Sequence, residues 1–178
     1  MSHRDTTPAF LGSVWIRPNA VALERIQDAI RMVHKQAGGP PVRPHVSLLG
    51  GIETTLGDAE SKLKKLASRL KPFEITLGKI DWRPEYFRSL FVTVEPSSEL
   101  VAAHAAAHEI FERMPTEPFE PHVSLLYGDF DESLKKQLAK ELGGRLDASF
   151  KAGAVDLVNA CEIVPVPEWK SVKQALIG

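Results

Sequence analysis

The sequence has a single cysteine, no long apolar run and no excess of charge of either sign, and each of these properties excludes a class of protein. The 178 residues include one cysteine, Cys161, so an intramolecular disulfide is excluded. No apolar run approaches the roughly 20 residues that a membrane span needs, and the first eight residues are polar. We therefore expect a soluble protein of the cytoplasm.

Neither sign of charge is in excess. Lys and Arg total 22 and Asp and Glu total 23, which gives a formal net charge of −1. A protein that grips long nucleic acid through its phosphates favours a basic face, so this balance argues against extended nucleic acid as a partner. A small anionic ligand held at a local site is compatible with the same balance.

The length and composition suit one folded unit. A chain of this size buries roughly 70% of its unfolded surface, so its stability requires no disulfide or metal. Hydrophobic residues make up 43% and charged residues 25%, the mixture of an ordinary globular protein. We treat residues 1–178 as a single domain.

Hydrophobic periodicity and breaker residues divide the chain into strands and helices. Within an expected strand over 10–17, Val14 and Ile16 belong to one face. Trp15 and Arg17 alternate with them and belong to the other face. Further strands are expected over 73–80, 89–94, within 148–164 and over 169–177, and helices are expected after caps at Asn19 and Asp58, from Ser98 to about Met114 and over 132–142.

One six-residue string, Pro-His-Val-Ser-Leu-Leu, occurs twice, at 44–49 and at 121–126. The copies lie 77 residues apart, and the strands expected to begin near Phe73 and Phe150 keep the same spacing. Repetition of a strand–helix–strand unit indicates duplicated halves, and two copies are too few for a solenoid. We expect an α+β fold of two related lobes, each with a mostly antiparallel sheet and helices outside.

Each copy of the string places a histidine and a serine on one face of a strand, because residues two apart share a face. His45 and Ser47 therefore point one way, and His122 and Ser124 repeat the pattern. A neutral imidazole can take a proton from water while an imidazolium protonates a leaving oxygen, and serine hydroxyls can hold a phosphoryl group. A lone strand histidine is usually structural, but two copies in matching halves favour one shared site.

The doubled string resembles the doubled His-x-Ser/Thr-x signature of the 2H phosphoesterase superfamily. Within that superfamily the chain looks most similar to the cyclic nucleotide phosphodiesterase branch, and the likeness spans nearly the whole chain. The segments that carry this likeness are Ser13-Val14-Trp15-Ile16, Tyr86-Phe87-Arg88-Ser89-Leu90-Phe91 and His122-Val123-Ser124-Leu125-Leu126-Tyr127. The resemblance implies a bilobal fold with pseudo-two-fold symmetry and a cleft between antiparallel sheets. It also implies hydrolysis of a 2′,3′-cyclic nucleotide, or of ADP-ribose 1″,2″-cyclic phosphate, to a monophosphate.

By position, the resemblance implies that His45 and His122 are the acid/base pair. It implies that Ser47 and Ser124 bind the phosphate and that Tyr127 contributes to the phosphate site. Ser47 stands where the first motif usually has threonine, which keeps the hydroxyl and loses some local stiffness. As a hypothesis, we assign His122 as the base that activates water and His45 as the acid on the leaving ribose oxygen.

Three further residues are weaker candidates for substrate contacts. Trp15 could line the cleft and stack a base, although core packing explains it equally well. Arg17 shares its face and could meet a phosphate, and Phe87 belongs to the aromatic segment. His104 and His108 lie four apart on an expected helix, a metal-binding spacing, but no third ligand is obvious. We expect neither a metal nor another cofactor.

Two other functions are alternatives. The RNA 2′–5′ ligase-like branch of the same superfamily works on RNA ends, so an RNA-end cyclic phosphodiesterase with a role in RNA processing is the enzyme alternative. A non-catalytic nucleotide- or RNA-binding module that kept the cleft is the alternative of another class. Our leading expectation is a monomer that hydrolyses a small cyclic nucleotide.

Overall fold

Among residues 9–178, which the computed structural model describes, eight strands form one sheet and four α-helices accompany it. The strands are β1 (Ala9–Ile16), β2 (Val46–Thr55), β3 (Phe73–Trp82), β4 (Leu90–Val94), β5 (His122–Leu126), β6 (Ser149–Ala152), β7 (Ala154–Val158) and β8 (Ser171–Leu176). The helices are α1 (Ala20–Ala37), α2 (Leu56–Arg69), α3 (Ser98–Ile110) and α4 (Glu132–Glu141), with short 3₁₀ helices η1 (Tyr86–Arg88) and η2 (Val166–Glu168). The expected α+β class is confirmed.

The sheet has the order β6-β3-β4-β5-β2-β1-β7-β8, and neighbouring strands run antiparallel. The strands with the repeated string, β2 and β5, are neighbours at its centre, where Val46 pairs with Val123. The expected repeats do not occupy separate halves of the sheet, because β3 of the first repeat lies between β4 and β6. The sheet is continuous across its centre, where β2 pairs with β5, and the division into two lobes stays a prediction.

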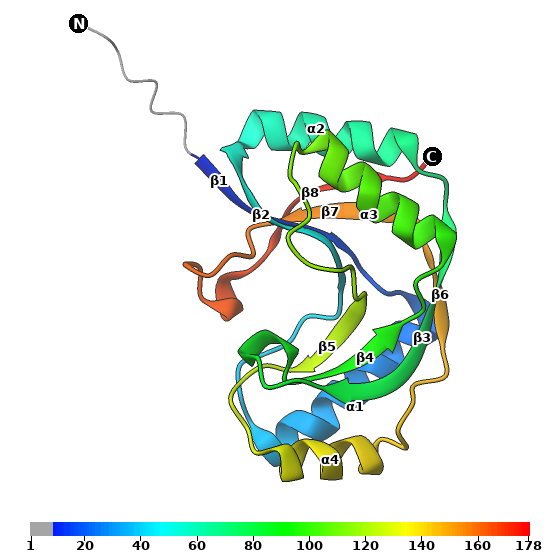
Figure 1. Cartoon of the computed structure of the whole chain (residues 1–178), viewed down its shortest axis with the longest axis vertical. Helices are drawn as coiled ribbons and strands as arrows, with labels where there is room; N and C mark the ends of the chain where they lie inside the picture. The colour runs from blue at the N-terminus through cyan, green and yellow to red at the C-terminus, as the bar shows by residue number, and fades with distance from the viewer. Residues whose placement is uncertain (1–8) are drawn as a thin grey trace, which may run out of the picture.

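The helices lie outside the curled sheet (Figure 1). α2 packs on β7 and β8 and α3 packs on β2, whereas α1 packs on β5 and β6 and α4 on β3. Figure 1 shows α2 and α3 together at one end of the molecule and α1 and α4 at the other, with the strands between them. None of the helices within residues 9–178 is long and apolar enough to cross a membrane.

Helix α1 illustrates how the sequence sets this packing. Its apolar side chains recur every three or four residues, so that Ala22, Ile26, Ala29 and Val33 are all buried. Full burial of a side chain the size of Ile26 contributes about 1.5–3 kcal/mol. Buried apolar residues of all four helices and of both halves of the sheet join one core cluster, and a second, smaller cluster contains Trp15, Tyr127, Val158, Ala160 and Trp169.

One expected helix cap was wrong, and the other is confirmed by position but not by a side-chain bond. α2 begins at Leu56, and the Thr55 hydroxyl accepts a hydrogen bond from the Asp58 N–H at 3.2 Å, so Asp58 does not cap the helix. Asn19 precedes α1, but its side-chain amide donates to the carbonyl of Lys151 at 2.9 Å. A long-range partner has replaced the local capping bond that the sequence suggests.

Two expected boundaries also moved. α3 ends at Ile110 rather than near Met114, and Glu112 has a φ of 55°, which an α-helix does not accommodate. The segment 148–164 holds two short strands, and after Val158 it continues as a loop. That loop leads to η2 and brings the last part of the chain to the site described next.

Candidate active site

The two strings meet at the centre of the sheet, where the valine of one lies opposite the valine of the other. In an antiparallel pair, extending this register by one residue sets His45 opposite Ser124. Extending it the other way sets Ser47 opposite His122. All four side chains share the face opposite to the valines, because side chains alternate along a strand. The repeated string therefore brings two imidazoles and two hydroxyls together, each histidine across from the serine of the other copy.

The two histidines are oriented in the same way. Nδ1 of His45 lies 2.7 Å from the carbonyl oxygen of Arg43, and Nδ1 of His122 lies 2.8 Å from that of Glu120. A carbonyl oxygen can only accept, so Nδ1–H donates in both rings. Nε2 is consequently the nitrogen of each ring that is left to exchange a proton with a ligand.

Burial lowers the pKa of both histidines. The pKa of His45 is lowered to about 4. Burial is the largest cause, the charge of His122 adds to it, and the hydrogen bond to the Arg43 carbonyl acts in the opposite direction. Desolvation is also the largest cause of the lowered pKa of His122, which the Glu120 carbonyl raises and the Arg88 guanidinium lowers. Both rings are therefore neutral near pH 7, and a phosphate bound between them would raise both pKa values.

The two serines differ in exposure. Ser47 is exposed, whereas Ser124 is buried. The Ser124 hydroxyl donates to the carbonyl of Phe87 at 3.1 Å. Burial raises the pKa of Tyr127 more than the neighbouring Ser124 hydroxyl lowers it, so the phenol keeps its proton. The site thus combines one accessible hydroxyl with one that is tied to the cavity wall.

One cavity of about 360 Å³ collects nearly all of the predicted site residues. It is lined by His45, Ser47, His122, Ser124 and Tyr127, and by two of the weaker candidates, Trp15 and Phe87. The remaining lining residues are Ser13, Gly51, Arg88, Ala160, Cys161, Glu162 and Trp169. This volume lies within the range of about 300–1,000 Å³ that is usual for small-molecule sites.

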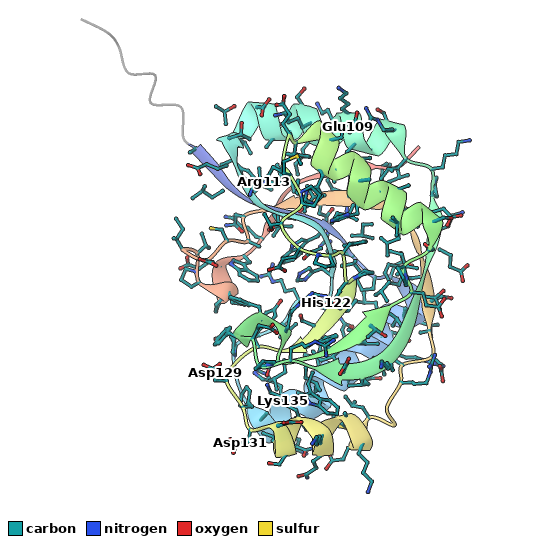
Figure 2. All side chains as sticks on the ribbon, in the orientation of Figure 1. Glu109, Arg113, His122, Asp129, Asp131 and Lys135 are labelled. Carbon is teal, nitrogen blue, oxygen red and sulfur yellow. The ribbon has the colours of Figure 1, made fainter. Side chains whose placement is uncertain are left out.

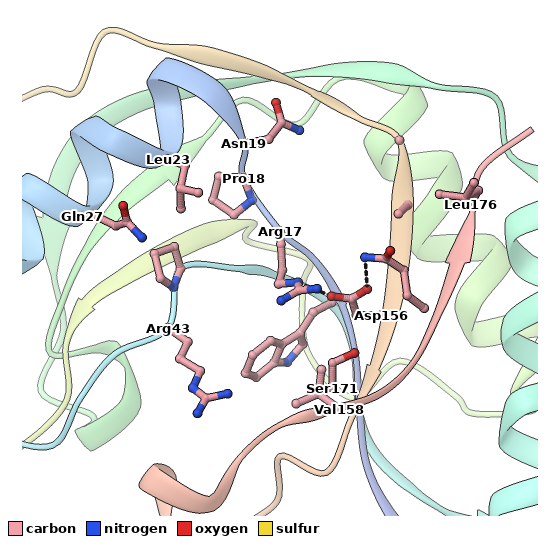
Figure 3. A pocket seen from close by; sticks show the side chains of 15 residues that line it. Arg17, Pro18, Asn19, Leu23, Gln27, Arg43, Asp156, Val158, Ser171 and Leu176 are labelled. Carbon is pink, nitrogen blue, oxygen red and sulfur yellow. Dashed lines mark hydrogen bonds and ion pairs between the residues drawn. The ribbon is translucent and has the colours of Figure 1, made fainter.

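Arg17 is the candidate that the structure places elsewhere. Figure 3 shows its guanidinium against Asp156 in a second cavity, of about 670 Å³, where the two side chains form an ion pair. Asp156 is 2% exposed and also accepts a hydrogen bond from Gln174 at 2.9 Å. A buried carboxylate needs a paired cation, so Arg17 has a structural role and does not line the cavity of the histidines. A phosphate contact from Arg17 stays a prediction that this placement does not favour.

Sequence reasoning missed Arg88 and Trp169. Arg88 is the last residue of η1, directly after Phe87, and it pairs with Glu120 at 3.3 Å while lining the cavity. A cation inside the aromatic segment is the signal that could have found it. Trp169 follows η2 and stacks on Phe87 with ring centroids 5.7 Å apart. No motif marks Trp169, because it reaches the cavity only through the packing of the C-terminal segment.

The helical histidine pair is packed rather than arranged around an ion. His104 and His108 contact each other with ring centroids 4.4 Å apart, and His104 stacks on Phe119 at 3.8 Å. Within the part of the chain that the structure describes, no three or more His, Cys, Asp or Glu side chains are grouped as a metal site.

Comparison with known proteins gives the chain a family. The sequence model of the 2′-5′ RNA ligase superfamily matches residues 17–160. The chain is 26% identical to a cyclic phosphodiesterase of Arabidopsis thaliana over 137 residues, which cover 77% of this chain and 75% of the plant protein. Its fold is similar to that of E. coli LigT solved with 3′-AMP, with a TM-score of 0.66, 16% identity, and coverage of 95% of this chain and 98% of LigT. A second solved structure, TT0787 of Thermus thermophilus, is similar at a TM-score of 0.64, with 18% identity and coverage of 95% and 97%.

The two kinds of likeness support different statements. The solved structures share little sequence with the chain and bear on the fold alone, which they place with LigT. The matched range 17–160 covers most of the chain and contains both copies of the repeated string. Together with the plant relative, it supports an enzyme of the phosphodiesterase class. The resemblance carried by the doubled string is confirmed, and the chain belongs to the 2′-5′ RNA ligase superfamily, the 2H phosphoesterases.

Proposed function

We propose that the protein hydrolyses a cyclic phosphodiester on a small nucleotide to a phosphate monoester, by acid and base catalysis from its two motif histidines. The observation that carries the proposal is the register of β2 and β5, which sets each histidine across from the serine of the other motif. Two groups that transfer protons and two hydroxyls then surround one cavity of about 360 Å³.

The reaction adds water across one P–O bond. A neutral imidazole takes a proton from the water through Nε2 while the water oxygen attacks phosphorus. The other imidazole, protonated, gives its Nε2 proton to the ribose oxygen as the bond between that oxygen and phosphorus breaks. The product is a phosphate monoester on one ribose oxygen and a hydroxyl on the other, and proton exchange with solvent restores both histidines. Each assisted transfer is worth about 10² to 10⁴ in rate.

The pKa values bear on which histidine is the base. The pKa of His45 is lowered to about 4, so its neutral form, which a base requires, dominates at neutral pH. The pKa of His122 is lowered as well. The dominant neutral form of His45 favours His45 as base and leaves His122 as acid, the reverse of the assignment expected from the sequence. The pH–rate profiles of the two single variants test the direction.

Hydroxyls and one cation would hold the phosphoryl oxygens. Ser47 is exposed and can turn its hydroxyl toward a ligand, and the neutral phenol of Tyr127 is a further donor. Arg88 lines the cavity and pairs with Glu120, whose side chain is 58% exposed. Exposed ion pairs of this kind contribute only about 0–1 kcal/mol, so Arg88 can exchange that partner for a phosphate.

The aromatic wall offers a place for the nucleobase. Phe87 is 40% exposed and stacks on Trp169, and both line the cavity. Stacking of a base on an aromatic ring contributes about 1–3 kcal/mol and tolerates every base. A 2′,3′-cyclic nucleotide or ADP-ribose 1″,2″-cyclic phosphate fits these surroundings. LigT, the neighbour in fold, was solved with the nucleotide 3′-AMP.

A cyclic phosphate at an RNA end is the second candidate. The superfamily to which the chain belongs is named after RNA ligases. A neighbouring cavity shares Ser47 and His122 with the cavity of the histidines, so the nucleotides that precede the cyclic phosphate of an RNA could bind there. Values of kcat/KM on a cyclic mononucleotide and on an RNA oligonucleotide that ends in a cyclic phosphate separate the candidates. The proposal expects the larger value for the mononucleotide.

Product analysis tests the proposal itself. Phosphorus NMR of a panel of cyclic phosphates incubated with the protein and excess chelator should show conversion of at least one of them to a monoester. Tight binding of a cyclic nucleotide without any monoester would contradict the proposal and would establish a binding module instead.

A further inference from the structure

The cavity of the histidines adjoins another cavity, of about 380 Å³, which we call the annex and which is distinct from the cavity at Arg17 and Asp156. Ser47, Gly51, Arg88 and His122 line both. The rest of the annex comes from residues 48–50 of β2, from the histidines of α3 and from the connection over 113–121. A group attached to a ligand at the histidines can therefore extend into the annex, and the side chains of the annex indicate the chemistry of that group.

Arg113 supplies the cation of the annex that lacks a partner. Among residues 9–178, its guanidinium takes part in no ion pair and donates no hydrogen bond, and the side chain is exposed. It lies against Gly51, where an added Cβ would be 2.9 Å from Nη2. Gly51 has a φ of +64° and no side chain, so the guanidinium reaches the border that the two cavities share.

The backbone of Arg113 is fixed in place. Its N–H donates to the carbonyl of His108 at 2.9 Å, and Nδ1–H of His108 donates to the carbonyl of Arg113 at 2.8 Å. Figure 2 shows Arg113 where the chain has left α3 and His122 where it enters β5. The backbone from which the guanidinium extends is therefore held at a set place relative to the cavity of the histidines.

The other charges of the annex leave Arg113 available. Arg88 and Glu120 pair at 3.3 Å and together add no net charge to the annex, and in the proposed function Arg88 turns to the phosphate between the histidines. Glu117 is exposed and is the other acidic residue that lines the annex. The planar fork of an arginine matches the oxygens of a phosphate and binds them with two parallel hydrogen bonds. The group that best fits the annex is a phosphate.

We propose that the annex binds a second phosphoryl group of the substrate, carried on the 5′ oxygen of the ribose whose cyclic phosphate lies between the histidines. A ribose with a 2′,3′-cyclic phosphate has its 5′ oxygen as the remaining position for esterification. This inference rests on the proposed function and names its substrate class, which is a 5′-phosphorylated cyclic nucleotide. ADP-ribose 1″,2″-cyclic phosphate belongs to the same class, because its pyrophosphate is attached at the 5″ oxygen.

Kinetics with matched substrates test the assignment. Values of kcat/KM are measured for adenosine 2′,3′-cyclic phosphate with and without a 5′-phosphate. The wild type should prefer the 5′-phosphorylated compound by about tenfold or more, the effect of one charge-assisted contact. Arg113→Gln should reduce the preference to about twofold or less, and Arg113→Lys should keep part of it, since lysine retains the charge and loses the fork. Arg31→Gln, which removes an exposed arginine of α1, is the matched control and should keep the full preference.

Two outcomes would overturn the assignment. One is a wild type that shows no preference for the 5′-phosphate. The other is an Arg113→Gln protein that loses equal activity on both substrates.

Binding separates this inference from the proposed function. Calorimetry compares adenosine 3′,5′-bisphosphate with adenosine 3′-monophosphate, neither of which requires turnover. The bisphosphate should bind about tenfold more tightly to the wild type and with a much smaller advantage to Arg113→Gln. If that difference is found but no cyclic phosphate is hydrolysed, the annex stands and the proposed hydrolysis fails. Equal affinities would overturn the annex even in an active enzyme.

Discussion

Trp15 lies flat against His45, with the ring centroids 3.5 Å apart and the planes inclined by 6°. The indole removes water from one face of the imidazole, which contributes to the burial that lowers the pKa of His45 to about 4. Trp15 is itself only 3% exposed, so it has little surface left on which a nucleobase could stack. Its clearest role in the site is to set the orientation and the proton affinity of His45.

This contact predicts a change in the pKa of His45 when the indole is shortened. In Trp15→Leu, water gains access to the imidazole, and the pKa of His45 should rise from about 4 toward 6.5, its ordinary value. Trp15→Phe keeps an aromatic ring and should give a smaller rise. Proton NMR titration of the histidine rings measures both. A pKa of His45 that is unchanged in a folded Trp15→Leu protein would show that the stack is not a cause of the shift.

The proposed acid/base pair predicts a loss of turnover when either histidine is replaced. His45→Asn and His122→Asn should each lower kcat by about 10² to 10⁴, because each removes one proton transfer. The double variant should lose less than the product of the two losses, since the groups act as a unit. His34→Asn, on the exposed surface of α1, is the matched control and should keep normal kcat. Full activity in either motif variant would exclude the pair as catalysts.

The unequal burial of the serines predicts different consequences for their removal. Ser47→Ala should lower kcat/KM and leave the free energy of unfolding within about 0.5 kcal/mol of the wild type, since Ser47 is exposed. Ser124→Ala should lower kcat/KM and also cost about 1 kcal/mol of stability, because it leaves the Phe87 carbonyl without its donor. Urea unfolding and steady-state kinetics on both variants provide the comparison. Equal destabilisation by the two substitutions would contradict this distinction.

The lowered pKa values predict a pH-dependent stability with a definite sign. Between about pH 6.5 and 4 the unfolded chain protonates His45 and the folded protein does not, so the unfolded state binds more protons. The free energy of unfolding should therefore be largest above pH 6.5 and should fall as the pH is lowered toward 4. His122 acts in the same direction, because its pKa is also lowered. His45→Asn should flatten the dependence, and a slope as steep as that of the wild type would refute the attribution to His45.

The sequence was informative where short-range pattern determines the structure. Residues two apart in a strand share a face, so His45 and Ser47 could be assigned to one side of β2 without knowing what lies next to it. The same argument on β5, together with the repeat, was enough to predict a shared site. The helices followed from the spacing of their apolar residues, as the buried face of α1 illustrates.

The sequence was less informative where the outcome depends on which strands become neighbours. Nothing local indicates that β7 pairs with β1, and this pairing sets Asp156 beside the strand that ends before Arg17, where the two form an ion pair. Trp169 lies more than a hundred residues from the first motif and reaches the cavity through the loop after β7. Long-range packing of this kind leaves no periodic or compositional mark, and the sequence therefore could not indicate that Arg17 lies against Asp156.

The central claim is that water, activated by one motif histidine, attacks a cyclic phosphate while the other protonates the ribose oxygen. The most direct measurement is hydrolysis of the substrate that the phosphorus NMR panel identifies, carried out in ¹⁸O-labelled water with excess chelator and analysed by mass spectrometry of the product. The account predicts a phosphate monoester that carries one labelled oxygen per turnover, and formation of this product should be strongly reduced in both His45→Asn and His122→Asn. A monoester without the label, or labelled product formed at the wild-type rate by either variant, would contradict it.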